Sequence, residues 1–269
     1  MPPLSTPDFC AAAMYVAQER RAYILRILQQ RGSIRSSALA RELGVTDETI
    51  RTDLVDMQAQ GLLQRVHGGA RYILPTPGCD SSTRPDCQLA ALAAQHIEPG
   101  MKIYLDSDPL ALVIVSQLED KPCTLLTNSP ELLTSLCATT LPHQIICLGG
   151  ELNKDCGILD SPLARDSLFG EHQPDAALLV PPALRSEVAA YRHPLRAAWA
   201  RAATEAAGQT LLMVPSLALQ AHAAHIFPLP DGCTIITENN LPPGFSHPNL
   251  ELIPFISAED LQQSSGFDY

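Results

Sequence analysis

Apolar residues recur at helical spacing between residues 24 and 57 and predict three short helices. The apolar positions that share a face in each helix are Ile24, Leu25, Ile27 and Leu28, then Leu39, Ala40 and Leu43, then Ile50, Leu54 and Met57. Gly44 separates the second helix from the third, because glycine adopts the left-handed conformation that ends a helix at no steric cost. Gly32 and Gly61 are placed to end the other two helices, and Val45 to pack between the second and the third.

Two short segments after these helices predict a β-hairpin. Residues 62–66 and 70–74 would pair across His67-Gly68-Gly69. We expect Gly68 and Gly69 to supply the positive φ that such a tip requires. Three helices followed by a glycine-tipped hairpin are typical of a winged helix-turn-helix, in which one helix lies in the major groove of DNA.

The rest of the chain alternates short apolar runs with helical stretches. The predicted strands are 102–106, 124–127, 144–148, 176–180, 210–214, 234–237 and 250–254. The predicted helices are 88–97, 111–118, 130–137 and 194–207. Alternating strands and helices predict an α/β fold with a mostly parallel sheet covered on both faces. Ligands of such sheets bind at the carboxyl ends of the strands.

Changes in composition mark the borders of these parts. Residues 1–15 are expected to be a disordered tail, with Met14 as the start of the native protein. The winged helix-turn-helix then occupies residues 16–74 and the α/β domain residues 87–269. Residues 75–86, rich in Pro, Gly and Ser, would form the linker between them.

The charge distribution supports DNA binding by the first part alone. The 269-residue chain has a net charge of −11, which would disfavour nucleic acid if it were uniform. Residues 1–73 hold nine Arg and seven acidic residues, net +2, whereas the remainder holds nine basic and 22 acidic residues, net −13. Arg suits bidentate contacts to phosphate and guanine. The acidic remainder should limit loose association with nucleic acid.

The eight cysteines show neither a Cys-x-x-Cys pair nor a Cys/His cluster with zinc spacing. We therefore predict reduced, buried thiols in a cytoplasmic protein, for example Cys147 in an apolar run, and neither a metal site nor a cofactor. No segment has the ~20 apolar residues of a membrane span. The first residues lack the basic region of a signal peptide, so no membrane partner is expected.

The polar positions of the third predicted helix indicate a DNA-binding face. Thr46 would cap the helix, and Thr49, Arg51 and Thr52 would face bases. The residues predicted to contact DNA are Arg35, Ser36, Thr46, Glu48, Thr49, Arg51, Thr52, Arg65, His67 and Arg71. For His67, the role of an ordinary turn residue fits equally well.

Residues 19–73 resemble the DNA-binding domain of the DeoR family of bacterial transcriptional regulators. The resemblance rests on Glu19-Arg20-Arg21, Leu39-Ala40, the segment 45–54 and the segment 61–70. The family usually has Ser at the position of Thr46 and a second Arg at that of Thr52. Thr46 can still cap the helix, whereas Thr52 removes one cation from the DNA-binding face and should weaken or alter DNA binding without abolishing it. The resemblance implies a repressor that binds operator DNA as a homo-oligomer, a dimer or a tetramer.

The second domain resembles, more loosely, the sensor domain of the same family, which has a sugar-phosphate isomerase and CoA-transferase-like fold. In that group, loops at the strand ends hold a small sugar phosphate, the effector. The resemblance therefore implies effector binding by Asp106, Ser107, Asn128, Gly149 and Gly150. For Asn128 and the two glycines, the alternative is a structural role, as a capping side chain and a tight turn.

Two departures from the family pattern affect this effector site. Where the family has Asp-x-Gly-Thr-Thr, this chain has Asp106-Ser107-Asp108-Pro109-Leu110, which adds a carboxylate and removes an amide donor and a hydroxyl. Pro215 and Ala218 replace the charged residues of the family's Asp-x-x-Lys motif. Losing the lysine–phosphate bond costs roughly 1.5–3 kcal/mol. We therefore predict a degenerate or altered site, for a less anionic ligand, or a domain used only to dimerise.

The alternative function is a sugar-phosphate isomerase or transferase-like enzyme with an appended helical module. Its acidic groups would be Asp106, Asp108 and Glu151, but no Lys or Arg falls in the three strand-end loops and Lys154 is the nearest. A third possibility is a scaffold that binds RNA or protein through the hairpin. The sequence favours a regulator of a carbohydrate-related operon, with no catalytic residues.

Overall fold

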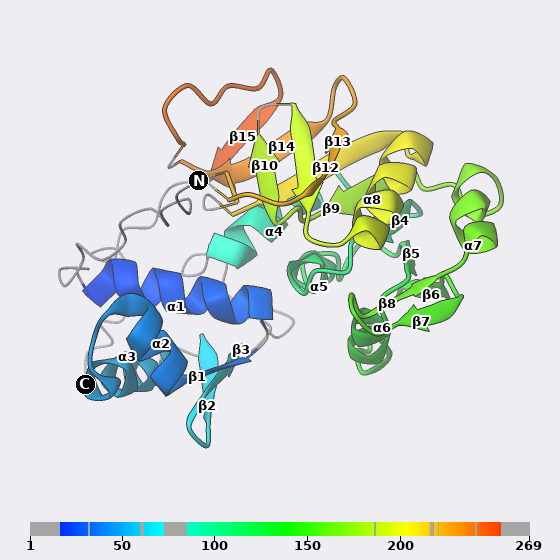
Figure 1. Cartoon of the computed structure of the whole chain (residues 1–269). Coiled ribbons are helices and arrows are strands. Elements are labelled where there is room, and N and C mark those ends of the chain that lie inside the picture. The colour runs from blue at the N-terminus through cyan, green and yellow to red at the C-terminus, as the bar shows by residue number, and fades with distance from the viewer. Residues whose placement is uncertain are drawn as a thin grey trace, which may run out of the picture. The chain divides into compact units, whose positions relative to one another are not determined.

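The computed structural model describes residues 17–31, 33–59, 62–72, 85–185, 187–215, 218–219, 221–239 and 241–253 (Figure 1). The predictions made for residues 1–15, for Gly32 and Gly61, and for most of the linker lie outside the described residues. The chain divides into two compact units, Met1–Pro75 and Thr76–Tyr269.

The first unit contains the three predicted helices and the predicted hairpin. Its elements are α1 (Ala17–Arg31), β1 (Ser33–Arg35), α2 (Ser36–Leu43), α3 (Asp47–Ala59), β2 (Leu63–Val66) and β3 (Gly69–Tyr72). Gly44 ends α2 with φ 66°, and its backbone N–H bonds to the carbonyl of Ala40. Strand β1 was not predicted, because three residues are too few to show an alternating pattern. It pairs antiparallel with β3 and gives a three-stranded sheet in the order β1-β3-β2.

The core of this unit consists of the apolar stripes that the sequence predicts. Its buried members are Ile24, Leu28, Leu39, Ala40, Leu43, Ile50, Leu54, Met57, Leu63 and Ala70. Val45 packs against this core between α2 and α3, as expected from its position after the turn. The helical periodicity therefore fixes which face of α3 is left outside.

The two glycines of the hairpin tip have different roles. Gly68 has φ +76°, as predicted, but Gly69 is not among the glycines with positive φ, so the prediction is wrong for Gly69. Gly69 lies opposite Arg35 of β1, and a Cβ on it would come within 2.1 Å of the Ile34 carbonyl oxygen. Glycine is needed there because the unpredicted strand approaches so closely.

The second unit is built on a seven-stranded sheet in the order β15-β14-β12-β9-β4-β5-β6, and every neighbouring pair is parallel. Its strands are β4 (Lys102–Leu105), β5 (Thr124–Thr127), β6 (Gln144–Cys147), β9 (Ala176–Leu179), β12 (Gln209–Val214), β14 (Thr234–Glu238) and β15 (Leu250–Ile253). All seven predicted strands are present, with ends shifted by at most one residue. The α/β fold after a winged helix-turn-helix is confirmed.

Helices cover both faces of this sheet. The helices are α4 (Pro85–Gln95), α5 (Leu110–Val115), α6 (Pro130–Cys137) and α8 (Pro194–Ala206). Helix α4 packs on β12, β14 and β15, whereas α8 packs on β9. Helix α4 begins at Pro85, so the last two residues of the predicted linker belong to it. Proline suits the first turn of a helix, where its missing N–H has no partner in any case.

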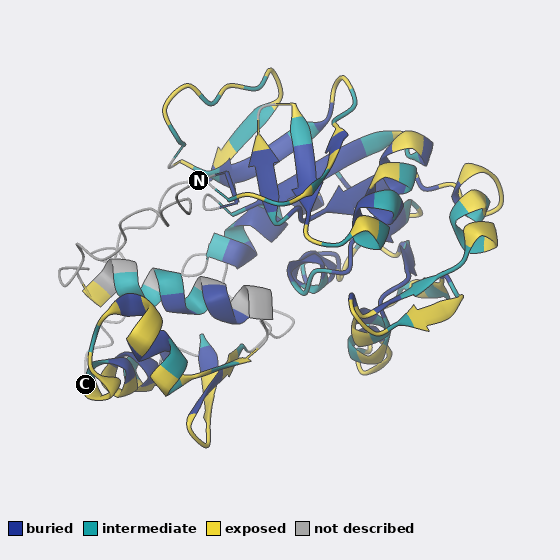
Figure 2. Ribbon diagram, viewed as in Figure 1, coloured by how far each residue is buried: buried dark blue, intermediate teal, exposed yellow. Residues whose placement is uncertain are grey.

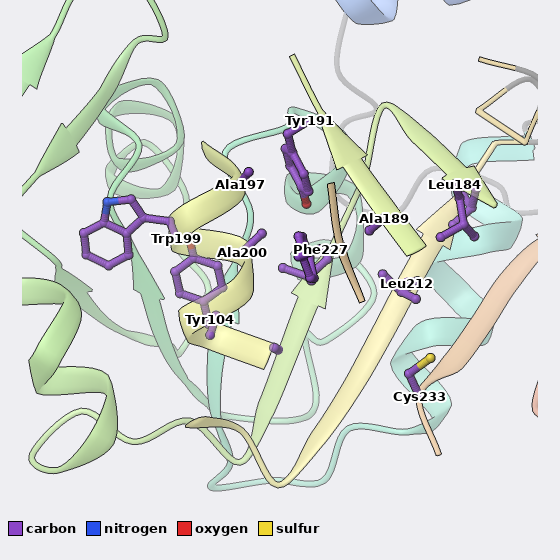
Figure 3. Close-up of a cluster of buried hydrophobic side chains, with 14 of the residues drawn as sticks. Tyr104, Leu184, Ala189, Tyr191, Ala197, Trp199, Ala200, Leu212, Phe227 and Cys233 are labelled. Atoms are coloured by element: carbon purple, nitrogen blue, oxygen red, sulfur yellow. The ribbon is translucent and has the colours of Figure 1, made fainter. Parts of the chain in front are cut away.

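A large hydrophobic cluster fills the space between the sheet and α8 (Figure 3). Tyr104 of β4 stacks on Trp199 of α8, with ring centroids 6.4 Å apart and an interplanar angle of 6°. Tyr191 stacks in the same way on Phe227, at 6.1 Å. Successive strand residues point to opposite faces, so Ile103 and Leu105, the neighbours of Tyr104, point away from this cluster.

Several short elements were not predicted. They are β7 (Glu151–Asn153), β8 (Ile158–Asp160), α7 (Pro162–Asp166), the 3-10 turn η2 (Ser167–Phe169), β10 (Ala183–Arg185), β11 (Val188–Tyr191) and β13 (His225–Pro228). Strands β7 and β8 form a hairpin, and β10, β11 and β13 form an antiparallel sheet that contacts α8 through β11 and β13. Each has three to five residues, too few for a helical or strand period to show.

The cysteines depart from the prediction of buried, reduced thiols. Cys87 is disulfide-bonded, and no Cys-x-x-Cys spacing in the sequence signals this bond. Cys123, Cys156 and Cys233 are free and buried, but Cys137 and Cys147 are free and exposed. Cys147 is exposed because β6 is an edge strand, which an apolar run in the sequence does not reveal. Across the described residues, every helix is too short or too polar to cross a bilayer.

Candidate nucleic-acid interface and strand-end site

The outward face of α3 carries the predicted base-contacting side chains. Glu48, Arg51 and Thr52 are exposed, and Thr49 is partly exposed, whereas the stripe based on Ile50 is buried. Figure 2 shows the ribbon coloured by burial in the view of Figure 1. The exposed fractions of the Glu48 and Arg51 side chains are 80% and 67%. They approach each other at 3.8 Å, and an exposed pair of this kind is worth little, so the Arg51 guanidinium is available to another partner.

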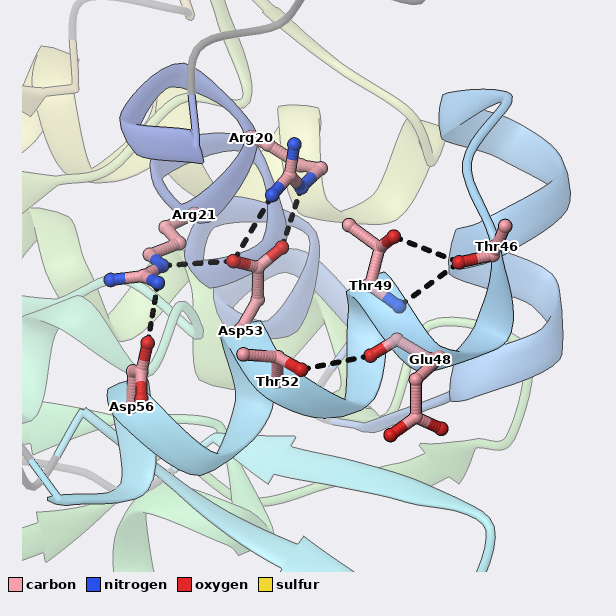
Figure 4. Close-up of polar contacts among 8 residues, drawn as sticks. All are labelled: Arg20, Arg21, Thr46, Glu48, Thr49, Thr52, Asp53 and Asp56. Carbon is pink, nitrogen blue, oxygen red and sulfur yellow. Dashed lines mark hydrogen bonds and ion pairs between the residues drawn. The ribbon is translucent and has the colours of Figure 1, made fainter.

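Thr46 caps α3, as predicted. The Thr49 backbone N–H donates to the Thr46 hydroxyl oxygen at 3.1 Å, and the two hydroxyl oxygens lie 2.8 Å apart (Figure 4). Asp47 and Glu48 occupy the first turn, where carboxylates suit the positive end of the helix dipole. The cap uses the Thr46 hydroxyl within the protein, so any contact of Thr46 with phosphate would share that oxygen.

The hairpin β2–β3 forms a wing that is fixed to the helices. Gln58 of α3 accepts the Arg65 backbone N–H at 2.8 Å, and the Ser36 N–H donates to the Gly68 carbonyl at 2.9 Å. Arg65 and His67 are exposed. The exposed Arg71 donates through Nε to Gln64 Oε1 at 2.7 Å, across the β2–β3 pair.

Arg35 and Ser36 lie at the start of α2. Arg35 is exposed in β1 and Ser36, partly exposed, begins the helix. The structure thus brings all ten predicted DNA-binding residues into one compact unit, on three neighbouring elements: the start of α2, the first half of α3 and the wing. Their contacts with DNA remain predictions.

A buried ion-pair network between α1 and α3 was not predicted. Asp53 is 1% exposed, and its carboxylate accepts from Arg20 Nε at 2.5 Å and from Arg21 Nε at 2.9 Å (Figure 4). Arg21 also pairs with the more exposed Asp56. A signal was present: Asp53 falls at i+3 from Ile50, inside the apolar stripe, where an acidic residue needs a cationic partner. Two of the nine arginines of the first part thus hold the fold together.

The strand-end site of the second unit lies where the strand order reverses. The chain adds β5 and β6 on one side of β4, and β9, β12, β14 and β15 on the other. The carboxyl ends of β4 and β9 therefore flank the switch point at which open α/β sheets bind ligands. Asp106 and Ser107, which follow β4, are both buried.

Asp106 is bonded on both carboxylate oxygens by its own chain. Oδ1 accepts from the Ser107 N–H at 2.6 Å, and Oδ2 accepts from the Val180 N–H at 3.0 Å and the Tyr191 hydroxyl at 2.6 Å. Burial raises the pKa of Asp106, although the hydrogen bonds from Tyr191 and Val180 act in the opposite direction. Burial, and then the Asp106 charge, likewise raise the pKa of Tyr191. This carboxylate joins β4, β9 and β11.

Asp108 is the less satisfied carboxyl group of this loop. Burial raises its pKa to about 7, the charges of Asp106 and Glu131 add to the shift, and the bond from the Leu110 N–H opposes it. Arg196 of α8 also lowers the pKa values of Asp106 and Asp108. The strand-end loops contain no Lys or Arg, and the positive charge that acts on them comes from Arg196 of α8. Arg196 was not predicted because it lies 88 residues further along the chain than Asp108.

Asn128 and Gly150 pack against the unpredicted strand β8. The Asn128 side-chain amide donates to the Leu159 carbonyl at 3.0 Å, whereas its buried Oδ1 has no hydrogen-bond partner. A Cβ on Gly150 would lie 2.3 Å from the Asp160 carbonyl oxygen, whereas one on Gly149 would meet nothing within 4 Å. A structural role therefore accounts for Gly150, and Asn128 Oδ1 is an acceptor that a donor group could still use.

The hairpin β7–β8 is held to α8 on the other side. Arg196 donates through Nε and Nη2 to the Cys156 carbonyl at 3.0 and 2.8 Å, and Trp199 Nε1 donates to Asp160 at 2.9 Å. The two bonds from Arg196 use two of the five N–H donors of its guanidinium. Among the described residues, no group of three or more His, Cys, Asp and Glu side chains could hold a metal ion.

Two family models match this chain. The DeoR-like helix-turn-helix domain matches residues 20–76, and the DeoR C-terminal sensor domain matches residues 87–239. The chain belongs to the DeoR family. The matched ranges contain all the DNA-contact and effector residues predicted from the sequence, although the matches assign no role to any single one of them.

Curated relatives with similar sequences are DeoR-type regulators. The uncharacterised helix-turn-helix-type transcriptional regulator YulB of Bacillus subtilis is 31% identical over 161 residues, 57% of this chain and 62% of that protein. The lactose phosphotransferase system repressor of Staphylococcus epidermidis is 27% identical over 143 residues, 50% of this chain and 57% of the repressor. The chain thus spans about three fifths of the length of the curated relatives it matches.

Two of the solved structures that match this DeoR-family protein show distant similarity to it. Ribose 5-phosphate isomerase A of Methanocaldococcus jannaschii has a TM-score of 0.36 and 11% identity, over 49% of this chain and 52% of that one. The eIF2B delta subunit of Chaetomium thermophilum has a TM-score of 0.38 and 14% identity, over 75% of this chain and 63% of that one. Similarities this low carry no information about function.

Proposed function

We propose that this protein is a DNA-binding transcriptional regulator, a repressor of a carbohydrate-related operon, and not an enzyme. The observation that carries the proposal is the outward face of α3, on which Arg51 is 67% exposed beside a wing with exposed arginines. Membership of the DeoR family supports it. So does the name of the Staphylococcus relatives, which are repressors of a lactose phosphotransferase system.

The positions of the exposed side chains support the proposed DNA contacts. Arg51, with Thr49 and Thr52 beside it, contacts base edges in the major groove, where an arginine pairs best with guanine. Arg35, Arg65 and Arg71 contact phosphates, which set the register without conferring sequence preference. Double-stranded operator DNA is therefore the macromolecular partner, and the cytoplasm the place of action.

A homo-oligomer, a dimer or a tetramer, belongs to the same proposal. A helix-turn-helix protein with two-fold symmetry binds two half-sites about one or two helical turns apart. The acidic remainder of the chain repels DNA and leaves association to the winged unit.

The strand-end site is altered relative to a sugar-phosphate site. Asp106 is fully engaged by its own chain, Asp108 adds a carboxyl group, and Arg196 is already bonded to the Cys156 carbonyl. The free acceptor of Asn128 suits a hydroxyl better than a phosphate. The effector is thus a less anionic carbohydrate, or the domain serves for dimerisation alone.

Selection of bound fragments from genomic DNA, followed by gel-shift titration, tests the DNA-binding function. We expect a half-site pair with a tight complex, and Arg71→Ala should weaken binding to every sequence and lower the salt slope by about one. Binding that ignores sequence, or no complex at low salt, contradicts the proposal. An enzyme of this fold would instead turn over a sugar phosphate without DNA.

Calorimetric titration tests the effector. Sugar phosphates and the corresponding unphosphorylated sugars are compared on the full chain. We expect no tight sugar-phosphate binding, and tight binding would show that the phosphate site is intact.

A further inference from the structure

The outward face of α3 carries an aliphatic side chain next to its polar groups. Val55 is 45% exposed, although Ile50, Leu54 and Met57 of the same helix are at most 1% exposed. Val55 lies three residues after Thr52 and four after Arg51, so the three side chains share one face of the helix. Val55 therefore extends the proposed base-contacting face by one turn and contributes little to the core.

Thr52 offers its methyl group on this face more readily than its hydroxyl. The Thr52 hydroxyl donates to the Glu48 carbonyl at 3.1 Å, one turn back along the helix (Figure 4). The hydroxyl hydrogen is thus used within the helix, whereas the methyl group forms no hydrogen bond and can make apolar contacts. Thr52 and Val55 together form what we call the aliphatic strip of α3.

The major groove presents one apolar group that suits such a strip, the C5-methyl group of thymine. We propose that Thr52 and Val55 recognise thymine methyl groups, so that the half-site carries one or two thymines beside the base pair that Arg51 contacts. This inference rests on the proposed DNA-binding function. It adds a base preference to the Thr52 position.

Thymine-to-uracil substitution tests the inference, because deoxyuridine pairs in the same way and lacks only the methyl group. The full chain first selects its site from a pool of random duplexes, and each thymine of that site is then replaced singly. We expect one or two positions to weaken binding about three- to five-fold, which corresponds to about 0.8 kcal/mol for one buried methyl group. The remaining thymines should have no effect.

Two variants assign the methyl contacts to side chains. Thr52→Ser keeps the hydroxyl and removes the methyl group, and Val55→Ala shortens the strip, so each should reduce the sensitivity to uracil at its own position. Val66→Ala is the matched control, since Val66 of β2 is also 45% exposed but lies off α3. It should leave the uracil sensitivity unchanged, and thermal melts show whether each variant is folded.

Different outcomes separate this inference from the proposed function. Sequence-specific binding without any sensitivity to uracil, or sensitivity that is undiminished in both Thr52→Ser and Val55→Ala, overturns the thymine contact alone. A selected site without thymine has the same consequence. Failure of the full chain to bind any duplex at low salt overturns both.

Discussion

The winged unit and the sheet unit use their polar residues in opposite ways. On α3 the polar side chains off the apolar stripe, such as Arg51, point outward, and only Asp53 is buried. At the strand ends of the sheet, Asp106 and Asn128 are buried and bonded by their own chain. A helix face follows from periodicity, whereas a loop sequence does not reveal whether its polar groups meet a ligand or the protein.

Asp106→Ala tests the sheet side of this comparison and has the largest expected effect. It leaves the Val180 N–H and the Tyr191 hydroxyl without an acceptor in the core, and each buried unsatisfied group costs about 1–3 kcal/mol. We expect the free energy of unfolding of the sheet unit to fall by about 3–4 kcal/mol. Denaturant titration followed by the fluorescence of Trp199, the single tryptophan, measures this.

Ser107→Ala is the control, because its hydroxyl is 3.4 Å from Asp106 Oδ1 and its backbone N–H is retained. Its effect should stay below about 1 kcal/mol. If the free energy of unfolding of Asp106→Ala is no lower than that of Ser107→Ala, the Asp106 carboxylate does not hold the core together and is available to a ligand. The contrast between the two units would then be wrong.

Asp53→Ala tests the buried polar residue of the winged unit. Arg20 and Arg21 would lose their shared partner, and because both arginines are partly exposed, we expect a loss of about 2–3 kcal/mol. Hydrogen exchange of peptides from α1 and α3 measures it. Asp56→Ala, which removes the more exposed carboxylate from the same Arg21, should cost less than about 1 kcal/mol. Equal losses in the two variants would contradict a buried clamp.

Asp108→Asn tests whether a negative charge on Asp108 destabilises the folded protein. The pKa of Asp108 is raised to about 7 in the folded protein, so the folded state binds more protons than the unfolded state between about pH 4 and pH 7. Stability therefore falls as the pH rises through this window. Since Asp108 is partly exposed, we expect Asn to stabilise the protein by about 1–2 kcal/mol at pH 8 and not at pH 4. If the difference in melting temperature between Asp108→Asn and the wild type is the same at pH 4 and at pH 8, the raised pKa of Asp108 is contradicted.

Thr46→Ala is expected to have the smallest effect. It removes the acceptor of the Thr49 N–H and should cost about 1 kcal/mol. Thr46→Ser, which keeps the acceptor oxygen, should behave like the wild type in thermal unfolding. A serine variant as unstable as the alanine variant would show that the cap is not the cause.

Much of the fold was predictable from the sequence, because it follows from local patterns. The stripe of α3, the turn at Gly44 and the seven parallel strands each have a period or a glycine that signals them. The role of Gly69 could not be predicted, because it depends on the close approach of the three-residue strand β1. The effect of the Arg196 charge on the pKa of Asp108 was not predictable either, because the two residues come from segments that are distant in the sequence. The disulfide of Cys87 likewise has no local signal.

The central claim is that the exposed face of α3 recognises base pairs. Comparing Arg51→Ala with Arg41→Ala, an exposed arginine of α2, on a selected duplex and a random duplex tests it most directly. Arg51→Ala should lose about 1–3 kcal/mol of binding free energy on the selected duplex and little on the random one, and Arg41→Ala should match the wild type on both. Wild-type affinity of Arg51→Ala for the selected duplex would contradict the account.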